Sequence, residues 1–89
     1  MSDTHWNVDV AVTEDGRETR CRARLSGREG TAMIGEGVAR ANPADENVAA
    51  IGDELAAARA LSDLSHQLLN TAARDIESRT HTPVQGLRA

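Results

Sequence analysis

The longest patterned stretch of the chain covers residues 48–79 and contains no proline and a single glycine, Gly52. Placed at about 100° per residue, its apolar side chains fall into two stripes separated by roughly a quarter of a turn. The first stripe holds Val48, Ile51, Leu55, Ala58, Leu69, Ala72 and Ile76, and the second holds Ala57, Leu61, Leu64 and Leu68. Together they are wider than the apolar stripe of an ordinary surface helix. The pattern predicts one long amphipathic helix that packs one stripe on a sheet and needs a second partner for the other.

The N-terminal part of the chain alternates between apolar and polar side chains, which is typical of half-buried strands. A first strand is predicted over residues 6–12, and Asp15-Gly16, within residues 13–17, favours a hairpin turn after it. Trp6 is the single aromatic residue of the chain, and it starts the apolar side of this strand, so we expect it to be largely buried. The apolar side of the strand consists of Trp6, Val8, Val10 and Val12.

Two further strands follow, over residues 18–25 and 31–41. Gly35 and Gly37 in the third strand indicate a bulge or a close approach of another backbone. The order β-β-β-α predicts an α+β fold in which a three-stranded antiparallel sheet packs on one long C-terminal helix. In the second strand, alternation directs Thr19, Cys21, Ala23 and Leu25 toward the helix and Arg20, Arg22 and Arg24 away from it.

The third strand is broken by Asn42-Pro43-Ala44-Asp45. Asp45 or Asn47 could then cap the helix, because a short polar side chain there accepts hydrogen bonds from free backbone amides. Residues 81–89 show no periodicity and are interpreted as a C-terminal tail. We therefore expect a single domain over residues 1–89 with its core over about residues 6–80.

The chain has 89 residues, one Trp, no Phe and no Tyr. A core of this size without large aromatic side chains leaves a thin margin of stability, and a second copy is a common remedy for small scaffolds. We therefore expect a homodimer whose interface includes some of Leu61, Leu64 and Leu68. Cys21 has no partner for an internal disulfide, and no apolar run approaches the roughly 20 residues that span a bilayer. These features predict a cytoplasmic protein without membrane contact.

The net charge of −4 is unevenly distributed, because residues 17–40 carry six arginines against three glutamates. Alternate residues of a strand share a face and lie roughly 7 Å apart, so Arg20, Arg22 and Arg24 form a row. This Arg row, with Arg28 in the following turn, could bind RNA phosphates through paired N–H donors.

The other interpretation of the Arg row is a solvated face whose arginines pair with Asp9 and Glu36 on neighbouring strands. No aromatic side chain on that face could stack on a base. The sequence alone leaves both interpretations open.

Candidate catalytic and metal-binding residues are few. Cys21 alternates toward the core, where a small apolar role is expected, and it has no histidine near it in the sequence. His5, His66 and His81 lack the spacing of metal ligands. Gly35-Glu36-Gly37 lacks the further glycine of a phosphate-binding loop. We therefore expect no enzyme activity, no metal and no cofactor, and we identify no small-molecule substrate.

Several segments together resemble a known family: Asn42-Pro43-Ala44-Asp45, residues 51–55 and 58–64, Asp75-Ile76-Glu77 and Thr80-His81-Thr82-Pro83. The chain resembles, from Trp6 to Pro83, the small actinobacterial proteins classed as a dsRBD-like domain of unknown function. A mycobacterial relative in this family is induced by hypoxia and dormancy and has been likened in shape to ribosome hibernation-promoting factors. The resemblance implies the α+β fold above, a homodimer and a ribosome-directed stress role, and it supplies no catalytic or binding residues.

Two functions of different classes remain. The first is a dimeric stress- or dormancy-associated protein that binds ribosomes or structured RNA through Arg20, Arg22, Arg24 and Arg28. The second is a dimeric protein–protein interaction module without nucleic-acid contact, which uses the polar helix face or a sheet edge.

Overall fold

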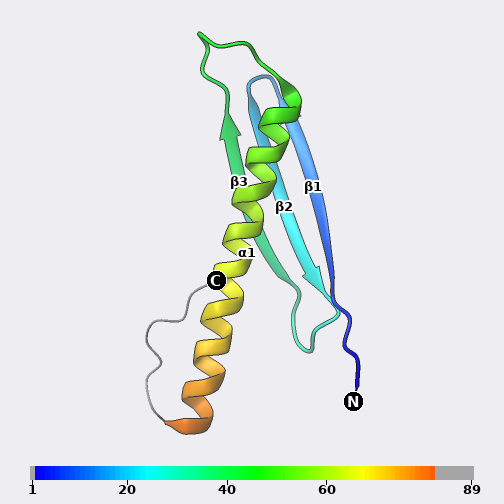
Figure 1. Cartoon of the computed structure of the whole chain (residues 1–89), viewed down its shortest axis with the longest axis vertical. Helices are drawn as coiled ribbons and strands as arrows, with labels where there is room; N and C mark the ends of the chain where they lie inside the picture. The colour runs from blue at the N-terminus through cyan, green and yellow to red at the C-terminus, as the bar shows by residue number, and fades with distance from the viewer. Residues whose placement is uncertain (1, 82–89) are drawn as a thin grey trace.

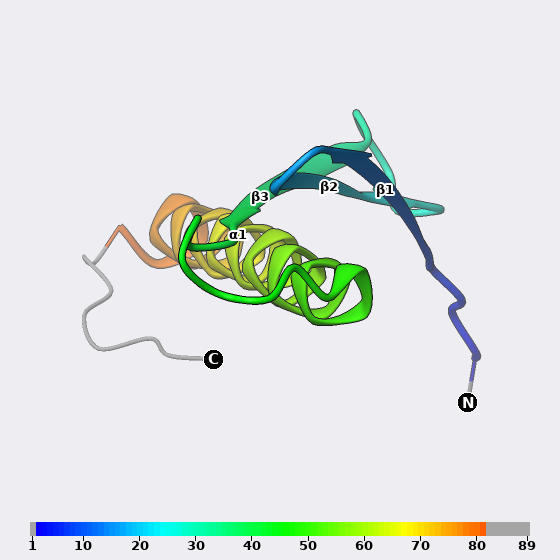
Figure 2. The same ribbon diagram turned by 90° about the horizontal axis from the view of Figure 1, so that it is seen from above.

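A computed structural model describes residues 2–81 and shows three strands followed by one helix (Figure 1). Strands β1 (Asn7–Asp15), β2 (Glu18–Ser26) and β3 (Met33–Arg40) form an antiparallel sheet in the order β1-β2-β3. Helix α1 (Ala49–Thr80) forms a second layer on one face of this sheet (Figure 2). The predicted α+β fold class is therefore confirmed. Apart from His81, the predicted C-terminal tail lies outside the described residues.

The β1–β2 hairpin is longer and tighter than the sequence pattern indicated. Asp15 pairs with Glu18, so the turn consists of Gly16 and Arg17 alone. Gly16 has a φ of 62°, in the left-handed region that glycine adopts without steric cost. β1 therefore continues to Asp15, and the predicted end at residue 12 was too early because residues 13–15 still pair with β2.

The rotation of α1 on the sheet is set by close contact between small residues. A side chain added at Gly35 would collide with the backbone of Ala60, and one added at Gly37 would collide with the backbone of Ala56. Glycines on β3 and alanines on α1 thus allow the helix backbone to lie directly against the strand. Of the two predicted meanings of the β3 glycines, the close backbone approach is the one observed.

This contact decides which side of α1 faces the sheet, and that side is centred on two alanines, Ala56 and Ala60, that neither predicted stripe included. Ala56, Ala60 and Leu64 are buried, and they pack with the inward side chains of β2 and β3. Of the second stripe only Leu64 is buried, and the first stripe points to solvent, with Ile51 55% exposed and Leu55 47% exposed. The rest of the buried apolar core is formed by Cys21, Ala23, Leu25 and Ala39.

Trp6 is 49% exposed, so the prediction that it is largely buried was wrong. A helix is about 10–12 Å wide with its side chains, and strands lie about 4.8 Å apart. One helix seated on β3 therefore covers β2 and β3 and leaves β1 beside it, as Figure 2 shows. The Trp6 side chain instead borders an open hollow that Arg28 and Asp75 also line.

The start of α1 also differs from expectation. Val48 is the N-cap residue and its side chain makes no capping hydrogen bond, so the predicted cap at Asp45 or Asn47 was wrong. The Asn47 amide instead donates to the Gly16 carbonyl at 3.2 Å. Arg17 donates to the backbone carbonyl of Asp45 at 2.9 Å. These contacts hold the β3–α1 connection against the β1–β2 turn, which takes both predicted caps away from the helix.

Candidate interaction surfaces

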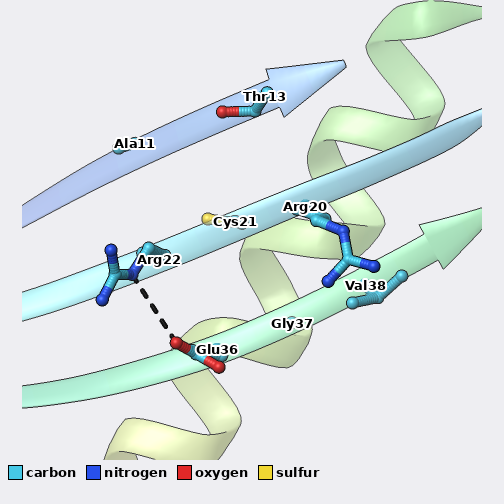
Figure 3. Close-up of a pocket in the computed structure, with 8 residues that line it drawn as sticks. All are labelled: Ala11, Thr13, Arg20, Cys21, Arg22, Glu36, Gly37 and Val38. Carbon is cyan, nitrogen blue, oxygen red and sulfur yellow. Dashed lines mark ion pairs between the residues drawn. The ribbon is translucent and has the colours of Figure 1, made fainter. Parts of the chain in front are cut away.

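The Arg row lies where alternation placed it: Arg20 and Arg22 are on the sheet face away from α1 (Figure 3), and Arg24 is exposed between the buried Ala23 and Leu25. Arg20 contacts Glu18 at 3.1 Å, and Arg22 contacts Glu36 at 3.6 Å. Glu18 also contacts Arg40 at 3.0 Å. All of these arginines are well exposed, so each ion pair contributes little to stability.

The outer face of the sheet, defined by the outward residues of all three strands, carries equal numbers of opposite charges. The acids are Asp9, Asp15, Glu18 and Glu36, and the bases are Arg20, Arg22, Arg24 and Arg40. The predicted partner Glu36 is therefore found, on Arg22. Asp9 is the cross-strand neighbour of Arg24. Arg28 lies in the β2–β3 loop and donates to the Thr31 carbonyl at 3.3 Å.

A shallow hollow of about 460 Å³ lies on this face, because Ala11 is short between longer neighbours. Figure 3 shows Arg20 and Arg22 beside it, with Thr13 on β1 and Val38 on β3. A second hollow of about 320 Å³ is lined by Asp9, Ala11, Arg22, Arg24 and Ile34. The guanidinium groups around both hollows could donate to an anion, but each also lies near a carboxylate.

The outer edge of β3 is closed by side chains from α1. Arg59 donates to the Val38 carbonyl at 2.7 Å, and Gln67 donates to the Ile34 carbonyl at 2.8 Å. Between them, Asp63 accepts a hydrogen bond from the Glu36 backbone N–H at 2.9 Å. A sheet edge normally presents unpaired N–H and C=O groups to solvent or to another chain. Here three helix side chains take that place along β3.

The edge of β1 is open. Within residues 2–81, no side chain of α1 bonds to the backbone of Asn7–Asp15. This strand has nine residues and contains neither proline nor lysine, the residues that commonly protect an edge. It is therefore the free edge of the sheet.

The strand that forms the free edge also carries exposed apolar side chains. Val8, Val10 and Val12 are on the helix side of the sheet, because they pair with the inward residues Leu25, Ala23 and Cys21. Uncovered by α1, they are 46%, 42% and 40% exposed. We call the surface formed by Val8, Val10, Val12 and Leu61 the β1 apolar surface.

Leu61 belongs to this surface because of its place on the helix. Arg59, one residue before the buried Ala60, reaches β3, so Leu61, one residue after it, lies on the side toward β1. Leu61 is 42% exposed. Leu68 is half-buried, and Leu64 is 4% exposed in the core of the protomer. Of the three leucines predicted for a dimer interface, Leu61 thus offers the most free area and Leu64 almost none.

A carboxyl pair that the sequence pattern did not reveal joins β1 to α1. A side-chain hydrogen bond with Asp53, followed by the charge of Asp53 and by burial, raises the pKa of Glu14 above its ordinary value of 4.5. Asp53 Oδ1 is buried and has no N–H donor among the described residues. The Glu14 carboxyl can therefore serve it only when protonated. The two residues are far apart in the sequence, and no local spacing marks them as a pair.

The surroundings of Cys21 bear on the reactivity of its thiol. Cys21 is buried, and its burial raises the pKa of the thiol, which disfavours the reactive thiolate. Residues 2–81 contain no group of three or more His, Cys, Asp or Glu side chains placed to hold a metal ion. In the same part of the chain, no helix combines the length and apolar character needed to cross a bilayer.

The fold and its surfaces define a small α+β protein with one sheet edge sealed by its helix and the other left open. The chain belongs to the Rv2632c-like family, whose sequence profile matches residues 4–85.

Relatives of the chain include mycobacterial proteins. The chain is 56% identical over 80 residues to Uncharacterized protein Rv2632c of Mycobacterium tuberculosis, a match that covers 90% of this chain and 85% of the relative. It is 51% identical over 81 residues to Uncharacterized protein Mb1767 of Mycobacterium bovis, which covers 91% and 85%. The crystal structure of Rv2632c is similar with a TM-score of 0.84 and 51% identity, over 93% of this chain and 98% of that chain.

Proposed function

We infer that the protein is a non-enzymatic homodimer that acts as a protein-interaction module. The observation that carries this is the β1 apolar surface, in which three valines and Leu61 are each at least 40% exposed. Contiguous exposed apolar side chains beside a free strand edge are typical of an association site and are a liability when left open. A second copy that covers them would also add apolar area to a core that has few large side chains.

Binding to ribosomes or structured RNA is the second candidate. It is favoured by the exposed Arg row and its two hollows, and the family resemblance links it to a stress or dormancy role. The equal number of carboxylates on the same face opposes it, because phosphate contacts by Arg20 and Arg22 would compete with their ion pairs to Glu18 and Glu36. Any such binding would be weak and would fall steeply with salt.

A salt-graded co-sedimentation assay with purified ribosomes separates the two functions. The interaction module predicts no ribosome association that depends on the Arg row at low salt. Association of the wild type that is lost in Arg20/Arg22/Arg24→Ser, with the same oligomeric state in both proteins, would establish the RNA function instead. Equilibrium sedimentation of the wild type tests the homodimer itself.

A further inference from the structure

We propose that two copies join through antiparallel pairing of β1 with the partner's β1, with Val10 at the two-fold axis. This inference rests on the homodimer of the proposed function and states its geometry. It would produce one continuous six-stranded sheet from two three-stranded sheets.

The first argument is that only one edge of each sheet can accept a strand. Arg59, Asp63 and Gln67 already bond to the outward backbone groups of β3. An incoming strand at that edge would have to displace all three helix side chains. At β1 the backbone groups meet no such side chain in the described part of the chain, so a strand can add there without disruption.

The second argument concerns which groups β1 presents. The antiparallel ladder starts at the two-residue turn with Asp15 opposite Glu18. The backbone N–H and C=O groups of odd-numbered β1 residues therefore bond to β2, and those of even-numbered residues point away from β2 at the free edge. By the same alternation across the sheet, the backbone N–H and C=O groups of the even-numbered β3 residues point away from β2, toward the outer edge of β3. This agrees with the bonds from α1 to Ile34, Glu36 and Val38. The backbone N–H and C=O groups that β1 presents at its free edge are therefore those of the valines and Glu14.

The third argument is symmetry. Residues directly opposite each other in a sheet share a face, and a two-fold axis between antiparallel strands keeps each residue on its own face. Even-numbered residues therefore meet even-numbered residues, and the valines of both copies lie on one side with both helices. Shifting the pairing of the two strands by one residue would place each valine opposite a partner residue whose side chain lies on the polar outer face. Such registers are therefore disfavoured.

Charge decides among the registers that remain. An axis at Asp9 would place Asp9 opposite the partner's Asp9, and an axis at Val12 would place Asp9 opposite the partner's Asp15. Like charges directly opposite each other are destabilising. An axis at Ala11 avoids this but puts Val8 opposite the partner's Glu14.

An axis at Val10 satisfies both charge and apolar matching. Val10 meets the partner's Val10, and Val8 meets the partner's Val12, so every valine of the strand lies opposite a valine. On the outer face Asp9 lies opposite the partner's Ala11, with Arg24 beside it on β2. Trp6 comes to lie beside the partner's Glu14, which would cover an indole that is half exposed in one protomer.

Amide hydrogen exchange followed by NMR tests the pairing directly. In the β1-paired dimer, the amides of Val8, Val10 and Val12 exchange as slowly as those of Asp9, Ala11 and Thr13. In a dimer formed through another surface, protection along β1 alternates, with the three valines fast. Alternating protection in a protein that sediments as a dimer overturns the pairing and leaves the homodimer intact, whereas a monomer overturns both.

Two lysine substitutions provide a matched comparison. Val10→Lys puts two like charges at the axis and removes the burial of two valines, so the dimer dissociation constant should rise roughly hundredfold. Ile51→Lys changes another exposed apolar residue, on the solvent side of α1, and should leave the dissociation constant unchanged. Circular dichroism should show both variants folded, because neither side chain is buried in the protomer. Equal dissociation constants for the two variants would contradict pairing through β1.

Discussion

Asp63 on α1 accepts a hydrogen bond from the backbone N–H of Glu36 at 2.9 Å, and this contact lies at the centre of the sealed edge of β3. On either side of it, Arg59 and Gln67 donate hydrogen bonds to backbone carbonyls of the same strand. The helix thus buries the inner face of β2 and β3, and its side chains also block association along the edge of β3. The two edges of the sheet therefore differ: side chains of α1 block the edge of β3, and the edge of β1 is left free for a second copy.

The sealed edge leads to the first prediction. Asp63→Ala leaves the Glu36 N–H without its partner, so the free energy of unfolding should fall by about 1 kcal/mol. The reopened edge should also make the variant prone to assemble beyond a dimer. Asp75→Ala, at an exposed acidic position of the same helix, gains the same helix propensity and serves as control. Urea unfolding and light scattering measure both effects, and equal behaviour of the two variants would contradict the role of Asp63.

The seating of the helix gives the second prediction. In Gly35→Ala the new methyl group meets the backbone of Ala60 and cannot be accommodated by a rotamer change. The loss in unfolding free energy should be about 3 kcal/mol or more, at the upper end of the range for overpacking. Glu36→Ala changes the outward-facing neighbour and should cost much less. A Gly35→Ala protein as stable as Glu36→Ala would show that the close contact does not set the helix position.

The Glu14–Asp53 pair gives a pH dependence. Because the folded-state pKa of Glu14 is raised above 4.5, its stabilising contribution is fully present below the ordinary value and is lost as pH rises through the folded value. Glu14→Gln keeps a donor for Asp53 at every pH. The variant should therefore be more stable than the wild type at neutral pH, and the difference should shrink as pH falls toward 4.5.

Thermal unfolding across this pH range, with Asp15→Asn as a control on the same strand, measures the difference. A constant offset between Glu14→Gln and the wild type at all pH values would mean that the carboxyl pair does not share a proton.

Much of the fold could be predicted from the chain because side-chain alternation has a fixed period in strands and helices. The predicted stripes missed the inward face of α1, because small alanines such as Ala56 and Ala60 carry a weaker apolar signal than leucine and isoleucine. Which face packs inward depends on the fit between Gly35 and Ala60, which lie on different elements. The error at Trp6 has the same origin: an apolar strand was assumed to be covered, but a helix seated on β3 is too narrow to reach β1.

The candidate sites were predicted unevenly for a similar reason. The Arg row followed from alternation within one strand. The carboxylates that balance it, and the partnership of Glu14 with Asp53, depend on tertiary contacts that only the structure supplies.

Trp6 offers a spectroscopic prediction. Its indole is half exposed in the protomer and would be covered by the partner, so its emission maximum should move to shorter wavelength as protein concentration rises. The Val10→Lys variant should keep the long-wavelength emission at every concentration. Emission that does not change with concentration in a wild type shown to dissociate over the same range would contradict a partner near Trp6.

Equilibrium sedimentation of the wild type and of Leu61→Asp tests directly whether the β1 apolar surface joins two copies. The account predicts a wild-type mass of twice 9.5 kDa in the micromolar range. It predicts a folded monomer for Leu61→Asp, because an unpaired charge in a dry interface costs several kcal/mol while Leu61 is 42% exposed in the protomer. A wild-type mass of 9.5 kDa throughout that range, or a Leu61→Asp dimer as stable as the wild type, would contradict it.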